Sequence, residues 1–212
     1  MAEQSIDSLI LTDTYNPAII PKLEEHLKRQ IKGEEEYHFL VNKTLLKQYQ
    51  FFPDLCNVEN VKSILTLSIV ALPEQHFNLF CFIIPEEVLV GNSEVAALVK
   101  LNNFLESCDF KEFWKHNKTL ETDSQQNFTL KVRGYILKVL SLTFKSCPFS
   151  VLLTSLDFAS KSEVETFCKS HSLVQEVTPE CLIFLTNSSN QPIKKIVKDG
   201  IVAKNLSVVM RN

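Results

Sequence analysis

Glycine is scarce in this sequence: only 4 of the 212 residues are Gly. Tight hairpin turns and phosphate-binding loops depend on glycine, because their backbones adopt conformations that a Cβ atom hinders. The phosphate-binding patterns GxxxxGK[ST] and GxGxxG, the GxSxG elbow and the HExxH zinc motif are all missing from the sequence. The scarcity favours helices joined by short polar loops and argues against a nucleotide-binding enzyme.

Cysteine and histidine are present but never grouped. The six cysteines stand singly without a CxxC pair, and none of the five histidines lies at metal-ligand spacing from another. Cys168 and His171 are three residues apart, but two ligands do not hold zinc. We therefore expect no disulfide, metal site, cofactor or enzymatic activity, although a Cys, His and Asn triad that meets only in space stays open at this point.

Long apolar runs are also missing. The most apolar stretch, residues 77–84, is far shorter than the roughly 20 residues that cross a bilayer, and Pro85 follows it. The first residues lack the basic start and apolar core of a secretory signal. These observations predict a cytoplasmic protein with reduced thiols and no membrane partner.

Charge is distributed unevenly along the chain. Five Lys or Arg and one Asp give residues 181–212 a net charge of +4, which leaves −7 for residues 1–180. Lys194, Lys195 and Lys198 are candidates for contact with RNA or an acidic partner, whereas a solvated basic segment is the simpler interpretation.

The first half of the chain is rich in helix signals. Asn16 before Pro17 is a typical helix start, and Gly33 is a typical end. Between them, apolar residues recur at every fourth position: Ile19, Leu23, Leu27 and Ile31. The outer face is expected to carry two ion pairs, Glu24 with Lys28 and Glu25 with Arg29.

Similar patterns predict a series of further helices up to residue 116. They cover residues 36–51, a stretch after Asn57 that ends before Pro73, residues 76–84 and residues 93–108, followed by a short helix after Asp109. Residues 76–84 are also rich enough in aromatic side chains to form a buried strand. The broad apolar faces imply helices that stack in pairs, as in repeat scaffolds, with Phe110 and Trp114 in the core. The polar stretch 117–127 is the best candidate for a domain boundary.

A different pattern follows the boundary. A long helix to about residue 145 is expected first, then a short apolar helix, and then a helix that starts with the capping box Ser160 to Glu163. Residues 174–177 and 181–185 are expected to form a small antiparallel β-hairpin. This is the order of elements in a winged helix, but residues 161–170 balance Lys with Glu and are not suited to bind DNA.

The second strand of that hairpin is apolar on both faces. Leu182 and Phe184 point one way, and Cys181, Ile183 and Leu185 point the other. A strand of this kind at the rim of a small sheet needs a cover. We predict that Leu182 and Phe184 contact a partner subunit, and an equally weighted alternative is that residues 201–210 fold back over the strand.

Several sequence blocks resemble the subunit k family of eukaryotic translation initiation factor 3. The blocks are residues 13–17 (DTYNP), 45–53 (LLKQYQFFP) and 104–114 (FLESCDFKEFW), with weaker echoes at 132–133 and 192–197. The resemblance implies a mostly α fold of the PCI type, with a HEAT-like helical repeat domain over residues 1–123 and a winged-helix domain over 124–212. The sequence departs from the family at Val151 and Asp157, where Trp and Gly are usual.

The resemblance also implies a role. It suggests a non-catalytic scaffold subunit of initiation factor 3 that contacts other subunits, chiefly subunit l, and lies on the small ribosomal subunit. Two alternatives are kept open: a nucleic-acid-binding winged helix that uses the basic C-terminus, or a PCI-type subunit of the proteasome lid or the COP9 signalosome.

Overall fold

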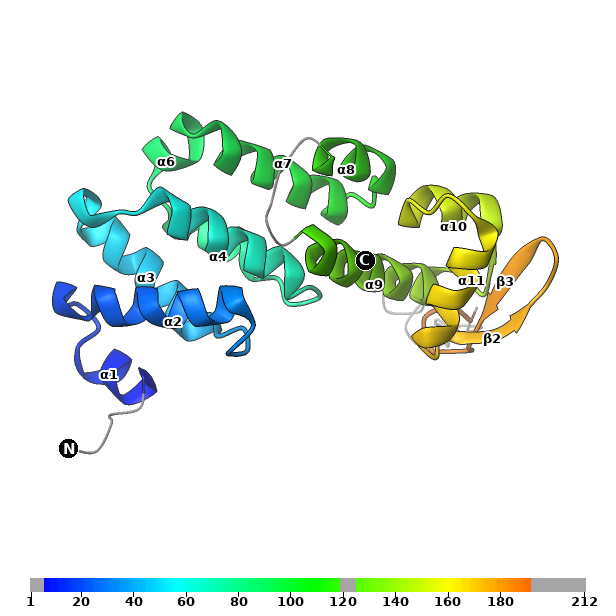
Figure 1. The fold of residues 1–212 in the computed structure, drawn as a ribbon, viewed down its shortest axis with the longest axis horizontal. Helices are drawn as coiled ribbons and strands as arrows, with labels where there is room; N and C mark the ends of the chain where they lie inside the picture. The colour runs from blue at the N-terminus through cyan, green and yellow to red at the C-terminus, as the bar shows by residue number, and fades with distance from the viewer. Residues whose placement is uncertain (1–5, 119–124, 192–212) are drawn as a thin grey trace, which may run out of the picture.

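The protein is mostly helical, with a small three-stranded antiparallel sheet near its C-terminus (Figure 1). The computed structural model describes residues 6–118 and 125–191. Helices α1 to α8 form one part of the molecule, and α9 leads from them to α10, α11 and the sheet at the other end (Figure 1). One continuous hydrophobic core runs through both parts.

The N-terminal part consists of short helices that pack on their neighbours. Helix α2 lies against α3 and α4, α4 lies against α5 and α7, and α7 lies against α8. The bounds of these elements are α1 Ile6–Thr12, η1 Pro17–Ile19, α2 Ile20–Lys32, α3 Phe39–Phe51, η2 Pro53–Leu55, α4 Val58–Val70, α5 His76–Ile83, α6 Glu86–Gly91, α7 Ser93–Glu106 and α8 Phe110–Asn117.

Side-chain caps fix the starts of five of these helical segments, η1, α3, α4, α7 and α8. Asn16 and Asn57 accept hydrogen bonds from the backbone amides of Ala18 and Glu59, both at 3.0 Å. Asp109 caps α8, and Asn92 caps α7, which begins at Ser93 as predicted. Each cap satisfies a backbone N–H that has no partner within its helix.

The Asn16 cap allows a first test. Asn16→Ala removes the acceptor for the Ala18 amide and is expected to lower the free energy of unfolding by about 1 kcal/mol. Urea denaturation measures the change, with Gln50→Ala on the exposed edge of α3 as the control. Equal effects of the two substitutions would contradict the capping role.

The buried face of α2 differs in part from the sequence prediction. Ile31 was placed on the buried stripe, but 41% of its surface is exposed, and Ile20 and Gln30 are buried instead. Residues four apart drift by about 40° around an α-helix, so Ile31 turns away from the face of Leu23 and Leu27, and Ile20 and Gln30 fall on that face. Glu25 pairs with Arg29 at 2.8 Å as predicted.

Glu24 does not form the expected outer ion pair with Lys28 among the described residues. Its Oε1 accepts hydrogen bonds from Tyr49 Oη at 2.5 Å and from Asn60 Nδ2 at 3.0 Å. Because these two partners come from α3 and α4, the carboxylate joins three helices rather than decorating the surface.

The C-terminal part contains one strand that the sequence pattern did not reveal. Strand β1 covers three residues between α9 and α10, and it pairs with β3, so the strand order is β1-β3-β2. The bounds are α9 Gln125–Thr143, β1 Ser146–Pro148, α10 Phe149–Leu156, α11 Lys161–Ser170, β2 Val174–Val177 and β3 Cys181–Phe184. The prediction that β3 lies at the rim of the sheet is therefore wrong: β3 is the central strand.

None of the helices in the described ranges combines the length and the apolar character that crossing a bilayer requires.

Candidate interaction surface

The two predicted contact residues on β3 lie in the core. Leu182 and Phe184 are 0% exposed, and Leu182 pairs across the sheet with the buried Cys147 of β1. Helices α10 and α11 contribute Leu152 and Val164 to the same core. Leu182 and Phe184 therefore pack in the core beneath the sheet and are not available on its surface.

The other predicted contacts, Lys194, Lys195 and Lys198, lie outside the described residues, as does the segment 201–210 that was considered as a cover for β3.

The opposite face of β3 carries the side chains that can meet a partner. Cys181 and Ile183 are half-buried, and Leu185, directly after the strand, is 47% exposed. The residues paired with Ile183 on the two neighbouring strands are Ser146 and Glu176, and both are exposed. The outer face thus has an apolar centre with polar neighbours.

The end of α9 extends this apolar face. Leu142 and Phe144 are exposed there, and the Lys145 carbonyl accepts a hydrogen bond from the Phe184 amide at 2.9 Å. This bond brings the chain after α9 alongside β3. We call the side chains of Leu142, Phe144, Ile183 and Leu185 the apolar sheet patch.

A polar loop after β3 fixes the patch. Asn190 Nδ2 donates to the Ser141 carbonyl at 3.1 Å and to the Leu185 carbonyl at 2.9 Å, so one buried amide joins the end of α9 to the end of β3. Asn187 Oδ1 accepts from the amides of Ser189 and Asn190 and shapes the turn. The sequence alone does not reveal the role of Asn190, because its partner Ser141 is distant along the chain.

A second group of contacts holds the sheet end to the helical part. The indole Nε1 of Trp114, on α8, donates to the Ser155 carbonyl of α10 at 2.7 Å. Arg133, on α9, donates from Nε to the Leu156 carbonyl at 2.8 Å and from Nη2 to the Asp157 carbonyl at 2.7 Å. The last carbonyls of α10, which have no partner within the helix, are thus satisfied by two other helices.

Asp157 ends α10 in the left-handed conformation, with φ 52°. A residue without a Cβ atom adopts this conformation most easily, so Asp157 occupies a position that suits Gly. Here the Asp157 carboxylate also pairs with Lys118 at 2.9 Å.

Two buried cysteines of the described part, Cys147 and Cys168, are poor candidates for chemistry. Burial raises the pKa of Cys168 to about 12 and that of Cys147 to about 11, so these thiols stay protonated and unreactive. His171, three residues after Cys168, is exposed. Within residues 6–118 and 125–191, no group of three or more His, Cys, Asp or Glu side chains could hold a metal ion.

The sequence of this chain is similar to those of known proteins over most of its length. The family described as CSN8/PSMD8/EIF3K matches residues 56–192. Three proteins named eukaryotic translation initiation factor 3 subunit K are similar over most of the chain. The one from Dictyostelium discoideum is 31% identical over 183 residues, which are 86% of this chain and 74% of that protein. Those from Bombyx mori and Xenopus laevis are 25% and 24% identical over 98% and 93% of this chain, and 94% and 90% of their own.

Proposed function

The chain belongs to the CSN8/PSMD8/EIF3K family, and from this premise we propose that it is a non-catalytic subunit of eukaryotic translation initiation factor 3. The observation that carries the proposal is the similarity to subunit K proteins of that factor along nearly the whole chain. The proposed place of action is the cytoplasm, in initiation on the small ribosomal subunit. The proposed means are protein contacts rather than chemistry.

The architecture that we propose is a HEAT-like helical domain over residues 1–123 and a winged-helix domain over 124–212, together a PCI-type module. Successive packed helices up to α8 support the first domain. The order α9, β1, α10, α11, β2, β3, with the sheet order β1-β3-β2, supports the second.

The surface that we propose for a neighbouring subunit, in the first place subunit l, is the apolar sheet patch. Exposed apolar side chains that lie together on a face with a polar rim are typical of contact sites. Leu142, Phe144 and Leu185 supply such a group, and Ser146 and Glu176 supply part of the rim. This proposal replaces Leu182 and Phe184, which are buried, with the opposite face of the same strand.

A charge placed in the patch tests this interface. Leu185→Asp is expected to reduce co-purification of the tagged chain with subunit l by about tenfold or more, because a carboxylate would lose its hydration in the contact without gaining a partner. The matched control is Leu130→Asp on α9, since Leu130 is 52% exposed and Leu185 is 47% exposed. Circular dichroism should show both variants folded.

Two outcomes would count against the patch. Full retention of subunit l by Leu185→Asp would place the contact elsewhere. Loss of stability in Leu185→Asp, together with a similar loss in a chain that stops after Gln191, would show that residues 192–212 cover the patch.

A second candidate function is nucleic-acid binding through the basic C-terminal segment with Lys194, Lys195 and Lys198. The net charge of +4 in residues 181–212 favours it. Helix α11 does not add to such a site, because Glu165 lies 3.9 Å from both Lys161 and Lys169. Binding of structured RNA that weakens steeply as salt is raised would support this candidate, and no binding at low salt would remove it.

A further inference from the structure

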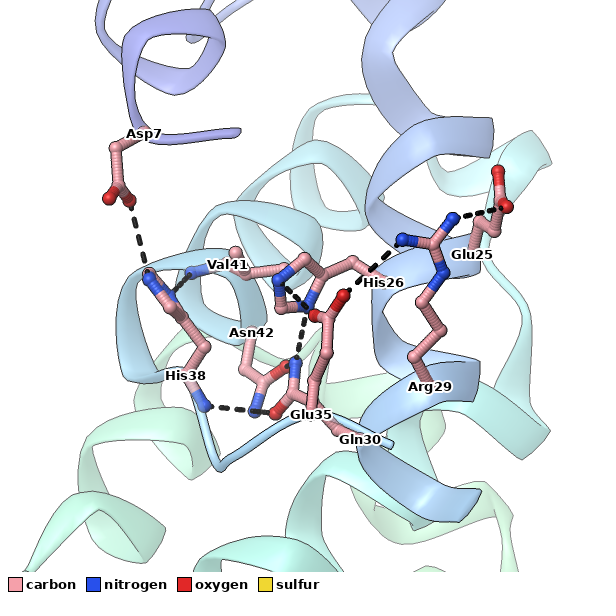
Figure 2. Close-up of polar contacts among 9 residues, drawn as sticks. All are labelled: Asp7, Glu25, His26, Arg29, Gln30, Glu35, His38, Val41 and Asn42. Atoms are coloured by element: carbon pink, nitrogen blue, oxygen red, sulfur yellow. Dashed lines mark hydrogen bonds and ion pairs between the residues drawn. The ribbon is translucent and has the colours of Figure 1, made fainter. Parts of the chain in front are cut away.

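A cluster of polar side chains joins α2 to α3 far from the sheet (Figure 2). At its centre, the side-chain amides of Gln30 and Asn42 face each other with two hydrogen bonds of 3.1 Å, Gln30 Nε2 to Asn42 Oδ1 and Asn42 Nδ2 to Gln30 Oε1. Both residues are buried. A buried amide pair of this kind is stable only while every donor meets an acceptor.

The orientation of the Gln30 amide is fixed by its partners. Its Oε1 also accepts from the backbone amide of His38 at 3.0 Å, so the oxygen has two donors in front of it. Turning the amide over would set N–H groups against N–H groups at both places. The remaining hydrogen on Gln30 Nε2 therefore points to His26 Nδ1, which lies 3.1 Å away.

His26 must consequently be neutral in this arrangement. Its Nδ1 can accept the hydrogen bond from Gln30 only while that nitrogen carries no proton. A proton on Nδ1 would set its N–H against the N–H of Gln30 Nε2. Only 13% of the His26 side chain is exposed, so water cannot readily enter to bridge these two donors. The Gln30–Asn42 pair and its bond to the turn before α3 would be disturbed together.

Three charged or titratable side chains act on His26. The closest contact is Glu35 Oε2, 2.5 Å from His26 Nε2, which forms no well-aligned hydrogen bond there and attracts a proton to the ring as a nearby charge. Burial outweighs this attraction and lowers the pKa of His26, with smaller contributions in the same direction from His38 and Arg29. The charged or titratable groups that act on the ring are Glu35 in the turn, Arg29 on α2 and His38 at the start of α3. Behind them, Asp7 on α1 pairs with His38, and Glu25 on α2 pairs with Arg29.

His38 links the same cluster to the N-terminal helix. It caps α3, where its Nδ1 accepts from the Val41 amide at 3.3 Å, and its Nε2 lies 3.3 Å from Asp7 on α1. The rings of His26 and His38 are 5.6 Å apart. A disturbance at His26 thus reaches both the start of α3 and the attachment of α1.

We propose that His26 is a proton-sensitive latch of the α2–α3 hairpin: the neutral ring holds the Gln30–Asn42 pair closed, and protonation loosens the turn over residues 33–38 and the attachment of α1. The direction of the pH effect on stability follows from the pKa of His26 in the folded and unfolded chain. A folded-state pKa below the unfolded value means that the unfolded chain binds the proton more tightly. The stabilisation by the latch is complete above the ordinary histidine pKa of about 6.5 and is lost as pH falls below it.

Hydrogen exchange measured between about pH 7.5 and about pH 5.5, on either side of the ordinary histidine pKa, tests the latch. Protection factors of amides in α1 and residues 33–38 are expected to fall about tenfold, the order of change expected when a buried hydrogen bond is lost. In His26→Asn, whose amide oxygen can still accept from Gln30 but does not titrate, the fall should be less than about twofold. The control is His171→Asn, since His171 is an exposed histidine directly after α11; this variant should behave like the unaltered chain.

A titration of the His26 ring by NMR in the unaltered chain makes the test independent of any variant. A ring that titrates below the ordinary value of about 6.5, together with a shift of the Gln30 side-chain amide signals, supports the latch. A ring that titrates above that value would overturn it, as would an equal loss of protection in His26→Asn and the unaltered chain.

Discussion

Phe184→Asp is expected to unfold the C-terminal part of the chain rather than to release a partner from a folded protein. Phe184 is 0% exposed and lies on the central strand of the sheet, opposite Val174 of β2. A carboxylate at this place would be buried without a partner, and the aromatic ring would leave a cavity, so the free energy of unfolding should fall by at least about 4 kcal/mol. Circular dichroism and urea denaturation measure the effect.

Leu185→Asp is the natural comparison, because it places the same charge one residue further along the chain on an exposed position. It should keep the unfolding midpoint of the unaltered protein within experimental error. If Phe184→Asp instead kept a native midpoint and lost only its partner, Phe184 would be a contact residue and the assignment of β3 to the core would fail.

Trp114→Ala is expected to cost about 3 to 5 kcal/mol of unfolding free energy. The indole is buried, packs edge-on against Phe113 with ring centres 4.9 Å apart, and donates its only N–H to the Ser155 carbonyl at 2.7 Å. The substitution removes apolar volume and also leaves a helix-terminal carbonyl without its partner. Because the bond crosses from α8 to α10, the docking of the sheet end should loosen as well.

Trp114→Phe separates the two contributions. It keeps most of the ring and removes the hydrogen bond, so a smaller loss of about 1 to 3 kcal/mol is expected. Hydrogen exchange should show weaker protection at the end of α10 in both variants. A loss after Trp114→Ala no larger than that of an exposed residue would contradict the role of this side chain as the link between the two parts.

Local signals made the helices of this chain predictable. The starts at Asn16, Asn57 and Asp109 and the end at Gly33 are each set by a side chain or a conformation within a few residues. The capping box at Ser160 likewise starts α11, where Ser160 Oγ accepts from the Glu163 amide. Such short-range chemistry can be read from the sequence without knowledge of the rest of the fold.

Long-range pairing could not be read in the same way. Strand β1 has only three residues, includes Pro148, and is recognisable only by its partner β3, more than 30 residues away along the chain. Without β1, β3 looks like an edge strand and its inner face looks like a contact surface. For the same reason, the sequence did not predict that Gln30 is buried, because its partner Asn42 comes from the next helix.

Residues from the sequence blocks that suggested the family contact one another in the structure. Tyr15 and Phe51 come from two separate blocks, and their rings meet edge to face with centres 5.4 Å apart. Trp114 and Arg133 come from two others and together cap the end of α10. The blocks therefore identify contacts between helices, which explains how they could point to a family without indicating any chemistry.

The most direct test of the central proposal is native mass spectrometry of the complex that co-purifies with the tagged chain. The account predicts one copy of the chain in an assembly of initiation factor 3 subunits that includes subunit l. An assembly of proteasome lid or COP9 signalosome subunits, or a chain that stays free of any partner, would contradict it.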